Sequence, residues 1–438
     1  IELTLTFWSQ NDFIRRLTMN KDAKKYYVIL SALLFFFFFT WSSSFSLISI
    51  WLHQYVGLKA TDTGLIFSAI SLIALCAQPL YGFIQDKLGL RKNLLLVIAV
   101  LLILSGPFFL SFAAILRWNI FIGSILGGLY VGMTFNAGIG VLESYTERVS
   151  RIRGFEYGRA RMWGSLGWAS ATFIAGHNIN IDPNYNFFMA SIAGVIFLIL
   201  LALLKTDKPD AFNQLEHGKP SALTINDALN LLSLPRFWAL ILFVVGTCIY
   251  SVYDQQFPVF FSSQFASLQQ GNEMYGYLNS LQVFLEAGGM FVAPFLVNKI
   301  GAKNGLLLAS SVMAARIIGS GLVEGPIMIS CMKLLHAVEL PILLISIFKY
   351  NSQHFDKRLS STLYLVGFQC VSSIVATLLS PLAGYGYDHY GFAPTYMVMG
   401  CMVVGTTLLS AVLLRADSKA LPQHDMTDLD SNNKAQPI

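Results

Sequence analysis

The heptapeptide Lys333-Leu334-Leu335-His336-Ala337-Val338-Glu339 lies within an apolar run that extends from Ile327 to Phe348. Residues three apart share one face of a helix, so Lys333, His336 and Glu339 form a single stripe. Ionisable groups are costly in hydrocarbon, and such a stripe therefore faces a bundle interior or a hydrated cavity. We interpret it as a proton-coupling site on a membrane helix. The alternative is a buried ion-pair network that only holds helices together.

The composition of the 438-residue chain is that of a membrane protein, with 55% hydrophobic and 12% charged residues. Soluble domains carry about 25% charged residues, and the apolar runs of about 20 residues that recur here can cross a bilayer. The formal charge of +5 is therefore no indication of nucleic-acid binding. All five cysteines fall in apolar runs without a CxxC pair, which indicates packing residues and predicts neither disulfides nor a metal site.

Twelve apolar segments predict an all-α membrane protein with twelve transmembrane helices in two pseudo-symmetric six-helix halves. A polar interruption at 206–235, expected to be a central loop, separates six-helix bundles at 26–205 and 236–415. Residues 1–25 and 416–438 are expected to be terminal segments, and because Met19 is a natural start, residues 1–18 are expected to be an extension. The expected helices lie near residues 26–52, 62–84, 93–114, 119–143, 161–180, 186–205, 237–259, 274–297, 304–323, 326–349, 360–383 and 391–414.

Basic residues are concentrated in alternate connections between the expected helices. The intervening connections contain only Lys59 and Arg117. Because cytoplasmic loops are enriched in Lys and Arg, both termini and the central loop are predicted to be cytoplasmic. Outside the central loop, the basic positions that carry this prediction are Lys24, Lys25, Lys87, Arg91, Lys92, Arg148, Arg151, Arg153, Lys299, Lys303, Lys357, Arg358 and Arg415.

One short motif occurs twice, after the second expected helix of each half. The first copy reads Asp86-Lys-Leu-Gly89-Leu-Arg91-Lys-Asn-Leu-Leu, and the second reads Asn298-Lys-Ile-Gly301-Ala-Lys303-Asn-Gly-Leu-Leu. A glycine suits a tight turn between helices, and basic residues suit helix ends that face the cytosol. We interpret the pair as an internal repeat, although two ordinary basic loops would match as loosely. Two parallel six-helix repeats are typical of major facilitator transporters.

Eight ionisable residues are expected inside the membrane, and their charges do not balance. Four carboxylates stand against three permanent cations and one histidine, so either one carboxylate is protonated or His336 is charged. This imbalance favours a proton symporter. A metal site at His336-x-x-Glu339 is disfavoured because no second His or Cys cluster exists and Lys333 would repel a cation. The eight residues are Glu143, Arg161, Asp254, Glu286, Arg316, Lys333, His336 and Glu339.

The sequence contains no P-loop, HExxH or GxSxG motif, which are the motifs typical of ATP-driven transporters and of hydrolases. No enzyme activity and no cofactor are therefore expected. Trp168 stands seven residues after Arg161, two turns along the same helix. It is either a tryptophan of the membrane interface or an apolar platform for a sugar ring. In the second case Arg161 would bind sugar hydroxyls, and Glu143 would hold Arg161 or share the sugar.

From about Tyr26 to Leu414 the chain resembles the oligosaccharide/proton symporters of the major facilitator superfamily, which include lactose, raffinose and sucrose permeases. The resemblance implies transport across the bacterial inner membrane by a functional monomer in contact with lipid. The motifs that carry it are Gly82-Phe-Ile-Gln-Asp86-Lys-Leu-Gly-Leu-Arg-Lys, Phe155-Glu-Tyr-Gly-Arg-Ala-Arg161-Met-Trp-Gly, Tyr253-Asp254-Gln-Gln, Ala315-Arg316-Ile-Ile-Gly-Ser and Lys333-Leu-Leu-His336-Ala-Val-Glu339.

The resemblance also implies a role for each motif residue. Glu143 and Arg161 would be central to sugar binding, with Trp168 stacked on a hexose ring and Asn136 nearby. Glu339 would carry the coupling proton, and Arg316 would favour its release. His336 would link the sugar and proton sites. The further implied members are a structural pair of Asp254 and Lys333 with Tyr250 close by, a gating loop of Gly82, Asp86, Gly89 and Arg91, and the substrate-binding residues Glu286 and Gln369.

Two departures from the lactose-permease pattern bear on the substrate. An essential carboxylate of that pattern is replaced by Val283, but Glu286 stands one turn later and could reach the same space. An Asp/Lys pair is replaced by Ser251 and Ser372, which leaves no unpaired charge.

Both departures match the sucrose-permease branch, as do Tyr277-Leu-Asn-Ser, Phe355-Asp-Lys-Arg-Leu-Ser-Ser-Thr and Gly367-Phe-Gln369. Glu143 departs in the other direction, because it is the longer acid of lactose and raffinose permeases. We therefore expect a proton-coupled disaccharide importer, with sucrose as the first candidate. A galactoside symporter for lactose, melibiose or raffinose is the alternative, together with an uncoupled facilitator or sensor.

Overall fold

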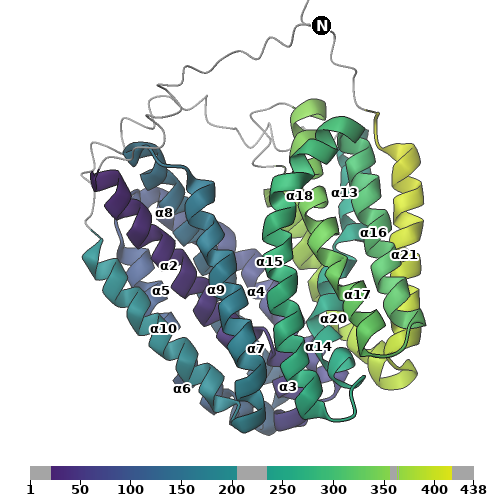
Figure 1. Ribbon diagram of the computed structural model, residues 1–438, viewed down its shortest axis with the longest axis horizontal. Coiled ribbons are helices and arrows are strands. Elements are labelled where there is room, and N and C mark those ends of the chain that lie inside the picture. The colour runs from purple at the N-terminus through teal and green to yellow at the C-terminus, as the bar shows by residue number, and fades with distance from the viewer. Residues whose placement is uncertain (1–20, 205–233, 356–362, 364, 417–438) are drawn as a thin grey trace, which may run out of the picture.

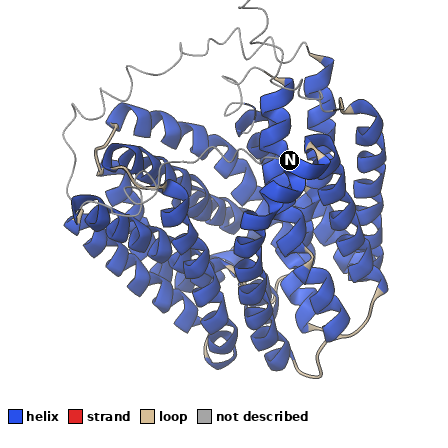
Figure 2. Cartoon of the chain, turned by 45° about the horizontal axis from the view of Figure 1, so that its top comes forward, coloured by secondary structure: helices blue, strands red, loops and turns tan. Residues whose placement is uncertain are grey.

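The computed structural model describes residues 21–204, 234–355, 363 and 365–416, and these residues are almost entirely helical (Figure 2). Ten helical rods are long and apolar enough to cross a membrane, and one bent pair of helices makes an eleventh. The twelfth long helix is α9 (Tyr157–Ile181), which is less apolar because it carries Arg159, Arg161 and His177. The predicted all-helical membrane fold is therefore confirmed, with Arg161 and Trp168 on the one long described helix that is not among these apolar spans.

The remaining helices follow one another as hairpins, and several of the predicted spans consist of two helices joined end to end. Those of the first half are α2 (Lys21–Phe45), α3 (Ile48–Trp51), η1 (Leu52–Val56), α4 (Ala60–Leu88), α5 (Asn93–Ile103), α6 (Ser105–Trp118), α7 (Ile120–Val131), η2 (Gly132–Ala137), α8 (Gly138–Arg153) and α10 (Asn184–Leu203). Those of the second half are α13 (Pro235–Thr247), α14 (Ile249–Ser262), α15 (Leu268–Ile300), α16 (Ala302–Leu322), α17 (Pro326–Leu334), α18 (His336–His354), η4 (Leu365–Cys370), α20 (Val371–Tyr390) and α21 (Phe392–Leu413).

The span expected at 93–114 is not one straight helix but a pair, α5 and α6, bent by 56°. Pro107 has no N–H to donate to the carbonyl of Ile103, and such a gap bends a helix. The hydroxyl of Ser191 on α10 donates to that carbonyl over 2.6 Å, and accepts from the N–H of Gly106 over 2.8 Å. A side chain of the neighbouring helix thus satisfies the backbone groups at the bend.

The span that contains the opening heptapeptide is also interrupted. α17 ends at Leu334 and α18 begins at His336, so Lys333 belongs to one helix and His336 and Glu339 to the next. Pro341, inside α18, cannot donate to the carbonyl of Ala337, which weakens the helical ladder just after this junction. The predicted stripe therefore crosses a helix junction, although the two helices still form one continuous span.

The two halves form separate groups of helices that lie side by side (Figure 1). They meet through two antiparallel helix pairs, α4 with α20 and α9 with α15. Glycines allow the close approach: a Cβ on Gly64 would lie 2.3 Å from the carbonyl oxygen of Ser380, and one on Gly276 would lie 2.9 Å from the Cα of Gly176. Gly64 and Gly276 each stand 25 residues before the motif glycine that follows their helix, so the two contacts are related by the internal repeat.

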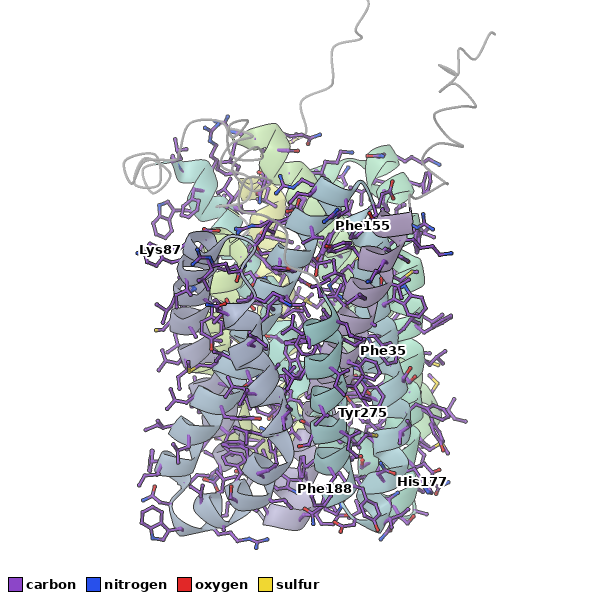
Figure 3. All side chains as sticks on the ribbon, turned by 90° about the vertical axis from the view of Figure 1, so that its left-hand side faces the viewer. Phe35, Lys87, Phe155, His177, Phe188 and Tyr275 are labelled. Atoms are coloured by element: carbon purple, nitrogen blue, oxygen red, sulfur yellow. The ribbon has the colours of Figure 1, made fainter. Side chains whose placement is uncertain are left out.

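Hydrogen bonds between the halves lie toward one end of the helices. Ser68 donates to the carbonyl of Thr377 over 2.6 Å, and Asn272 bonds the amides of Gln54 and Asn180 over 2.9 and 3.1 Å. This is the end at which His177 lies, opposite to the end that carries Lys87 and Phe155 (Figure 3). In Figure 1 the two groups of helices diverge toward the other end. The conformation is therefore closed at the His177 end.

Candidate functional site

The second half holds a network of five ionisable side chains from α14, α16, α17 and α18. Arg316 lies at its centre, with Nη1 3.0 Å from Asp254 Oδ1 and Nη2 2.6 Å from Glu339 Oε1. Lys333 Nζ lies 2.8 Å from Asp254 Oδ1, and His336 Nδ1 lies 2.9 Å from Glu339 Oε1. Asp254, which the sequence paired with Lys333 alone, is therefore shared by two cations.

The centre of this network is dry, whereas the side chain of Asp254 is 20% exposed. The side chains of Arg316 and Glu339 are both 0% exposed, and the ring of Tyr253 packs 4.8 Å from the guanidinium. The network has equal numbers of carboxylates and permanent cations when His336 is neutral. Within the part of the chain that the structure describes, Glu339 Oε2 is buried and accepts no hydrogen bond. A bare carboxylate oxygen in such surroundings is unfavourable, so this atom is suited to bind a proton.

The first half holds a smaller and wetter cluster. The guanidinium of Arg161 on α9 donates from Nε to Oε1 of Glu143 on α8, and each of the two side chains is 33% exposed. The ring of Phe38 lies 4.3 Å below the Arg161 guanidinium, and the hydroxyl of Tyr157 hydrogen-bonds with the same group. Arg161 is thus oriented by a carboxylate, a ring and a hydroxyl, while part of its fork stays accessible.

Trp168 lies in contact with the aromatic residues of α2. Its ring is edge-on to Trp41 at 5.5 Å and to Phe38 at 6.5 Å, and its backbone carbonyl accepts from the Ser42 hydroxyl over 2.9 Å. Trp41 in turn stacks on Phe135 with an angle of 8° between the rings. Trp168 therefore belongs to the bundle interior and not to a belt of residues at the membrane interface.

Glu286 reaches the space between the halves from α15. Because Gly176 faces Gly276 in an antiparallel pair, ten residues along each helix bring Glu286 level with about Leu166, between Arg161 and Trp168. The carboxylate interacts electrostatically with Arg161, Lys333 and His336, and accepts from the Gln282 amide over 2.9 Å. Among the described residues it forms no ion pair. Glu286 is therefore the carboxylate in excess that the sequence count detected.

The remaining predicted site residues are less closely joined to these clusters. The ring of Tyr250 lies 5.5 Å from that of His336. Asn136 lies in the π-helical turn η2, where its carbonyl accepts from Gln78 over 3.2 Å. Gln369 lies in η4, next to residues outside the described ranges, and no described contact joins it to the other site residues. Ser251 donates to the backbone carbonyl of Cys248 over 2.8 Å, and Ser372 hydrogen-bonds with the thiol of the same residue.

The predicted gating loop has a polar counterpart in the second half. Gly89 and Gly301 both have positive φ, 59° and 90°, as the tight turns require. Asp86 forms an ion pair with Arg148 of α8, and Asn298 accepts from Lys349 of α18 over 3.0 Å. Gly82 has open space around its Cα, and Arg91 is exposed, so neither is joined to the ion pair.

Three residues of the site were not found from the sequence. Phe38 belongs to a run of five phenylalanines, 35–39, and nothing in the run distinguishes the ring that lies on Arg161. Tyr157 carried no signal beyond its place in the Arg161 motif. Arg148 was used only for orientation, and its spacing from Asp86 gives no indication of their contact.

Comparison with known proteins gives the chain its family. A model described as the LacY proton/sugar symporter matches residues 18–425. The chain belongs to this symporter family. It is 44% identical over 379 residues to the melibiose permease of Enterobacter cloacae subsp. cloacae, which covers 85% of this chain and 89% of that protein. It is 42% and 40% identical to the raffinose and sucrose permeases of Escherichia coli, at 85% and 83% of this chain and 89% and 88% of those proteins.

Solved structures share the fold of this LacY-family symporter. The nucleoside transporter NupG superposes with a TM-score of 0.74 at 13% identity, covering 90% of this chain and 100% of that one. The inward open xylose transporter XylE from E. coli gives 0.67 at 13% identity, covering 92% and 99%. These structures establish the major facilitator fold, and the family match establishes sugar/proton symport through an integral membrane protein. The relatives divide among several sugars, so the family alone does not single out sucrose.

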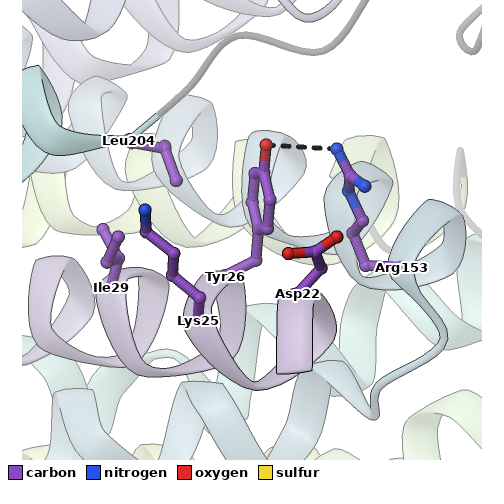
Figure 4. A pocket seen from close by; sticks show the side chains of 6 residues that line it. All are labelled: Asp22, Lys25, Tyr26, Ile29, Arg153 and Leu204. Atoms are coloured by element: carbon purple, nitrogen blue, oxygen red, sulfur yellow. Dashed lines mark hydrogen bonds between the residues drawn. The ribbon is translucent and has the colours of Figure 1, made fainter. Parts of the chain in front are cut away.

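A separate pocket of about 250 Å³ lies at the beginning of α2 (Figure 4). The hydroxyl of Tyr26 accepts from Arg153 over 3.1 Å at its edge. None of the predicted site residues lines this pocket. It is therefore not the candidate sugar site.

Proposed function

We propose that this symporter imports a disaccharide together with one proton, and that both termini lie in the cytoplasm. The observation that carries the proposal is the dry network around Arg316, in which Glu339 Oε2 is buried without a hydrogen-bond partner. The proposed sugar site is distinct: Arg161, Glu143 and Trp168 lie in the opposite half, and Glu286 of α15 interacts electrostatically with Arg161.

The proton step follows from the geometry of Glu339. Arg316 lies 2.6 Å from Oε1 and favours the anion, whereas the bare Oε2 favours the protonated acid. A small movement of Arg316 toward or away from Glu339 would therefore change proton affinity, while Asp254 keeps the arginine neutralised. His336, bonded to Glu339 and beside Tyr250, is placed to transmit changes at the sugar site.

The sugar step uses groups from both halves. The fork of Arg161 and the carboxylate of Glu143 can form charge-assisted bonds with sugar hydroxyls, and Trp168 offers an apolar face. Glu286 would bind a hydroxyl from the other side. A ligand bound to both halves favours the conformation in which they are closest, and this is how sugar would promote the transition.

The orientation proposal gives the conformation a direction. With the basic connections in the cytoplasm, the contacts at the His177 end close the periplasmic side. The sugar site lies beyond these contacts along α9 and α15, toward the cytoplasm. The structure would then correspond to the inward-facing state, from which sugar and then the proton leave.

Sucrose is the substrate we propose first. Glu286 interacts electrostatically with Arg161, one turn after Val283, which stands where the lactose-permease pattern has its carboxylate. Ser251 and Ser372, which stand where that pattern has an Asp/Lys pair, both lie beside Cys248. A galactoside is the second candidate. It is favoured by the longer acid Glu143 on Arg161 and by the identities to the melibiose and raffinose permeases.

The test is the external pH of a lightly buffered, de-energised suspension of expressing cells, after separate additions of sucrose, lactose, melibiose and raffinose. Symport of a sugar draws protons inward and makes the medium alkaline. We expect alkalinisation with sucrose. Alkalinisation with galactosides alone would transfer the assignment to the second candidate, and no response to any of the four would contradict disaccharide symport.

A further inference from the structure

A carboxylate of one half caps a helix of the other half at the closed end of the molecule. Asp388 lies near the end of α20 and accepts three hydrogen bonds from the beginning of α4. The donors are the backbone N–H of Ala60 over 3.0 Å, the backbone N–H of Thr61 over 2.8 Å and the Thr61 hydroxyl over 2.6 Å. Both Asp388 oxygens are used, so the two helices are joined in one geometry.

The residues just before α4 provide no side-chain acceptor for the N–H groups at the beginning of this helix, and the contact with Asp388 provides one. The first N–H groups of a helix have no partners within the helix, and they form its positive end. The residue at the N-cap position is Lys59, whose side chain accepts no such bond and cannot, because an ammonium group has no acceptor. Asp388 therefore supplies from the second half the cap that α4 lacks.

The other antiparallel pair is closed differently. Between α9 and α15, the amide of Asn180 donates to the carbonyl of Gln269 over 2.7 Å, and Asn272 bonds Asn180 and Gln54. His177 lies 3.6 Å from Glu273 at the rim. Several neutral amides thus share the closure of that pair. Between α4 and α20, one carboxylate carries the charged contact, assisted by Gln256, which donates to the carbonyl of Ala60 over 2.9 Å.

We propose that Asp388 is a latch that holds α4 against α20 in the closed conformation and is released when the halves separate at this end. The cap exists only while the halves touch, so its contribution stabilises one conformation and not the other. Removal of the carboxylate would therefore shift the equilibrium toward opening at the His177 end. An N-cap carboxylate changes such an equilibrium by about fivefold.

The experiment measures the opening of the α4–α20 contact directly, and it does not require an assay of sugar or proton transport. Cysteine is placed at Ser380, which is 1% exposed and adjoins Gly64, after the five native cysteines are replaced by alanine. The rate of alkylation by a membrane-impermeant maleimide is measured in right-side-out vesicles. Asp388→Ala should raise this rate about fivefold, and Asp388→Asn should raise it less, because the amide oxygen still accepts but carries no charge.

The matched control is Glu324→Ala, which removes an exposed carboxylate of the second half that has no described contact with α4. Its alkylation rate should equal that of the parent. An unchanged rate in Asp388→Ala would overturn the latch. If that variant is absent from the membrane, the isosteric Asp388→Asn decides: a higher rate supports the latch and an unchanged rate rejects it. The inference rests on alternating access, but the readout does not depend on which sugar is carried.

Discussion

The two halves of the molecule hold their buried charges in opposite ways. In the first half, Arg161 and Glu143 form one ion pair whose side chains are each one third exposed. In the second half, Asp254, Arg316, Lys333, His336 and Glu339 form a closed network in which the central arginine and Glu339 have no exposed surface. A group that binds sugar must exchange water for ligand, whereas a group that stores one proton is most sensitive when water is excluded. The difference in hydration therefore separates the two tasks.

The two helix pairs that join the halves can be compared in the same way. Gly64 and Gly276 occupy related positions and permit backbone contact in the two antiparallel pairs. The glycine contacts at the closed end are thus related by the repeat, while the polar contacts around them and the charged clusters of the two halves are not. We infer that the internal repeat provides the same close glycine contact in both helix pairs, and that each half carries a different cluster of ionisable residues.

The largest expected effect is the loss of closure when a glycine of these pairs is enlarged. In Gly276→Val, the new Cβ would lie 2.8 Å from the carbonyl oxygen of Thr172, so the closed conformation should become inaccessible. Uphill sugar uptake should fall to background. Gly288→Val is the control on the same helix, because a Cβ there meets nothing within 4 Å. Equal uptake by the two variants would show that close contact at Gly276 is dispensable.

The second-largest expected effect shows whether Asp254 is needed by Lys333 alone or also by Arg316. Asp254→Asn leaves Lys333 without its counter-ion in a buried site, at a cost of about 3–5 kcal/mol. Uptake and the yield of folded protein should both fall. Adding Lys333→Gln removes the unpaired charge, while Glu339 still neutralises Arg316, so most of the yield should return. A double variant as poor as the single one would mean that Asp254 is needed by Arg316 itself.

A smaller effect is expected in the wetter half. Arg161→Lys keeps the charge but loses the planar fork that bonds Glu143 and, in our proposal, the sugar. The loss of about 2 kcal/mol corresponds to roughly thirtyfold weaker sugar binding, which equilibrium binding to purified protein measures. Arg159→Lys, on the exposed side of the same helix turn, should bind normally. Parental affinity in Arg161→Lys would remove this residue from the sugar site.

The smallest effect concerns the ring that supports Arg161. Phe38→Leu removes the contact of 4.3 Å with the guanidinium and should weaken sugar binding about threefold to fivefold. Phe39→Leu removes a ring of the same run that contacts only Phe35 and Phe36 among the described aromatic residues, and it should have little effect. Equal losses in both variants would indicate general loosening of α2 instead of a specific contact.

Much of the fold and part of the candidate site could be predicted from the sequence. Apolar runs and alternating basic loops predict the helical membrane fold, because the bilayer imposes both patterns on every spanning helix. The least apolar span, α9, was still predicted at 161–180, because its arginines lie near its beginning and no Asp, Glu, Lys or Arg follows them in the helix. The pairing of Glu143 with Arg161 was likewise expected, because a charge in the membrane needs a partner. That of Arg316 with Glu339 was implied by the family resemblance.

Other features depend on packing and could not be predicted from the residues. The second partner of Asp254 requires knowledge of where α14, α16 and α17 meet, and the ring under Arg161 is one phenylalanine among five. The sequence count of four carboxylates against three cations was interpreted as one protonated carboxylate or a charged His336. The structure shows that both ion clusters balance, and that Glu286 is the carboxylate left over. Which carboxylates are paired with a cation depends on distances between side chains in the folded protein, and a count of residues carries no distances.

The central claim is that Glu339 carries the coupling proton while sugar binding belongs to the other cluster. The most direct test is Glu339→Gln, assayed in the same vesicles for uphill accumulation and for exchange of labelled against unlabelled sugar. The substitution keeps the shape of the side chain but removes the proton that must be released. We expect accumulation to be lost and exchange to be retained. Accumulation at the parental level would contradict the assignment of the proton to Glu339.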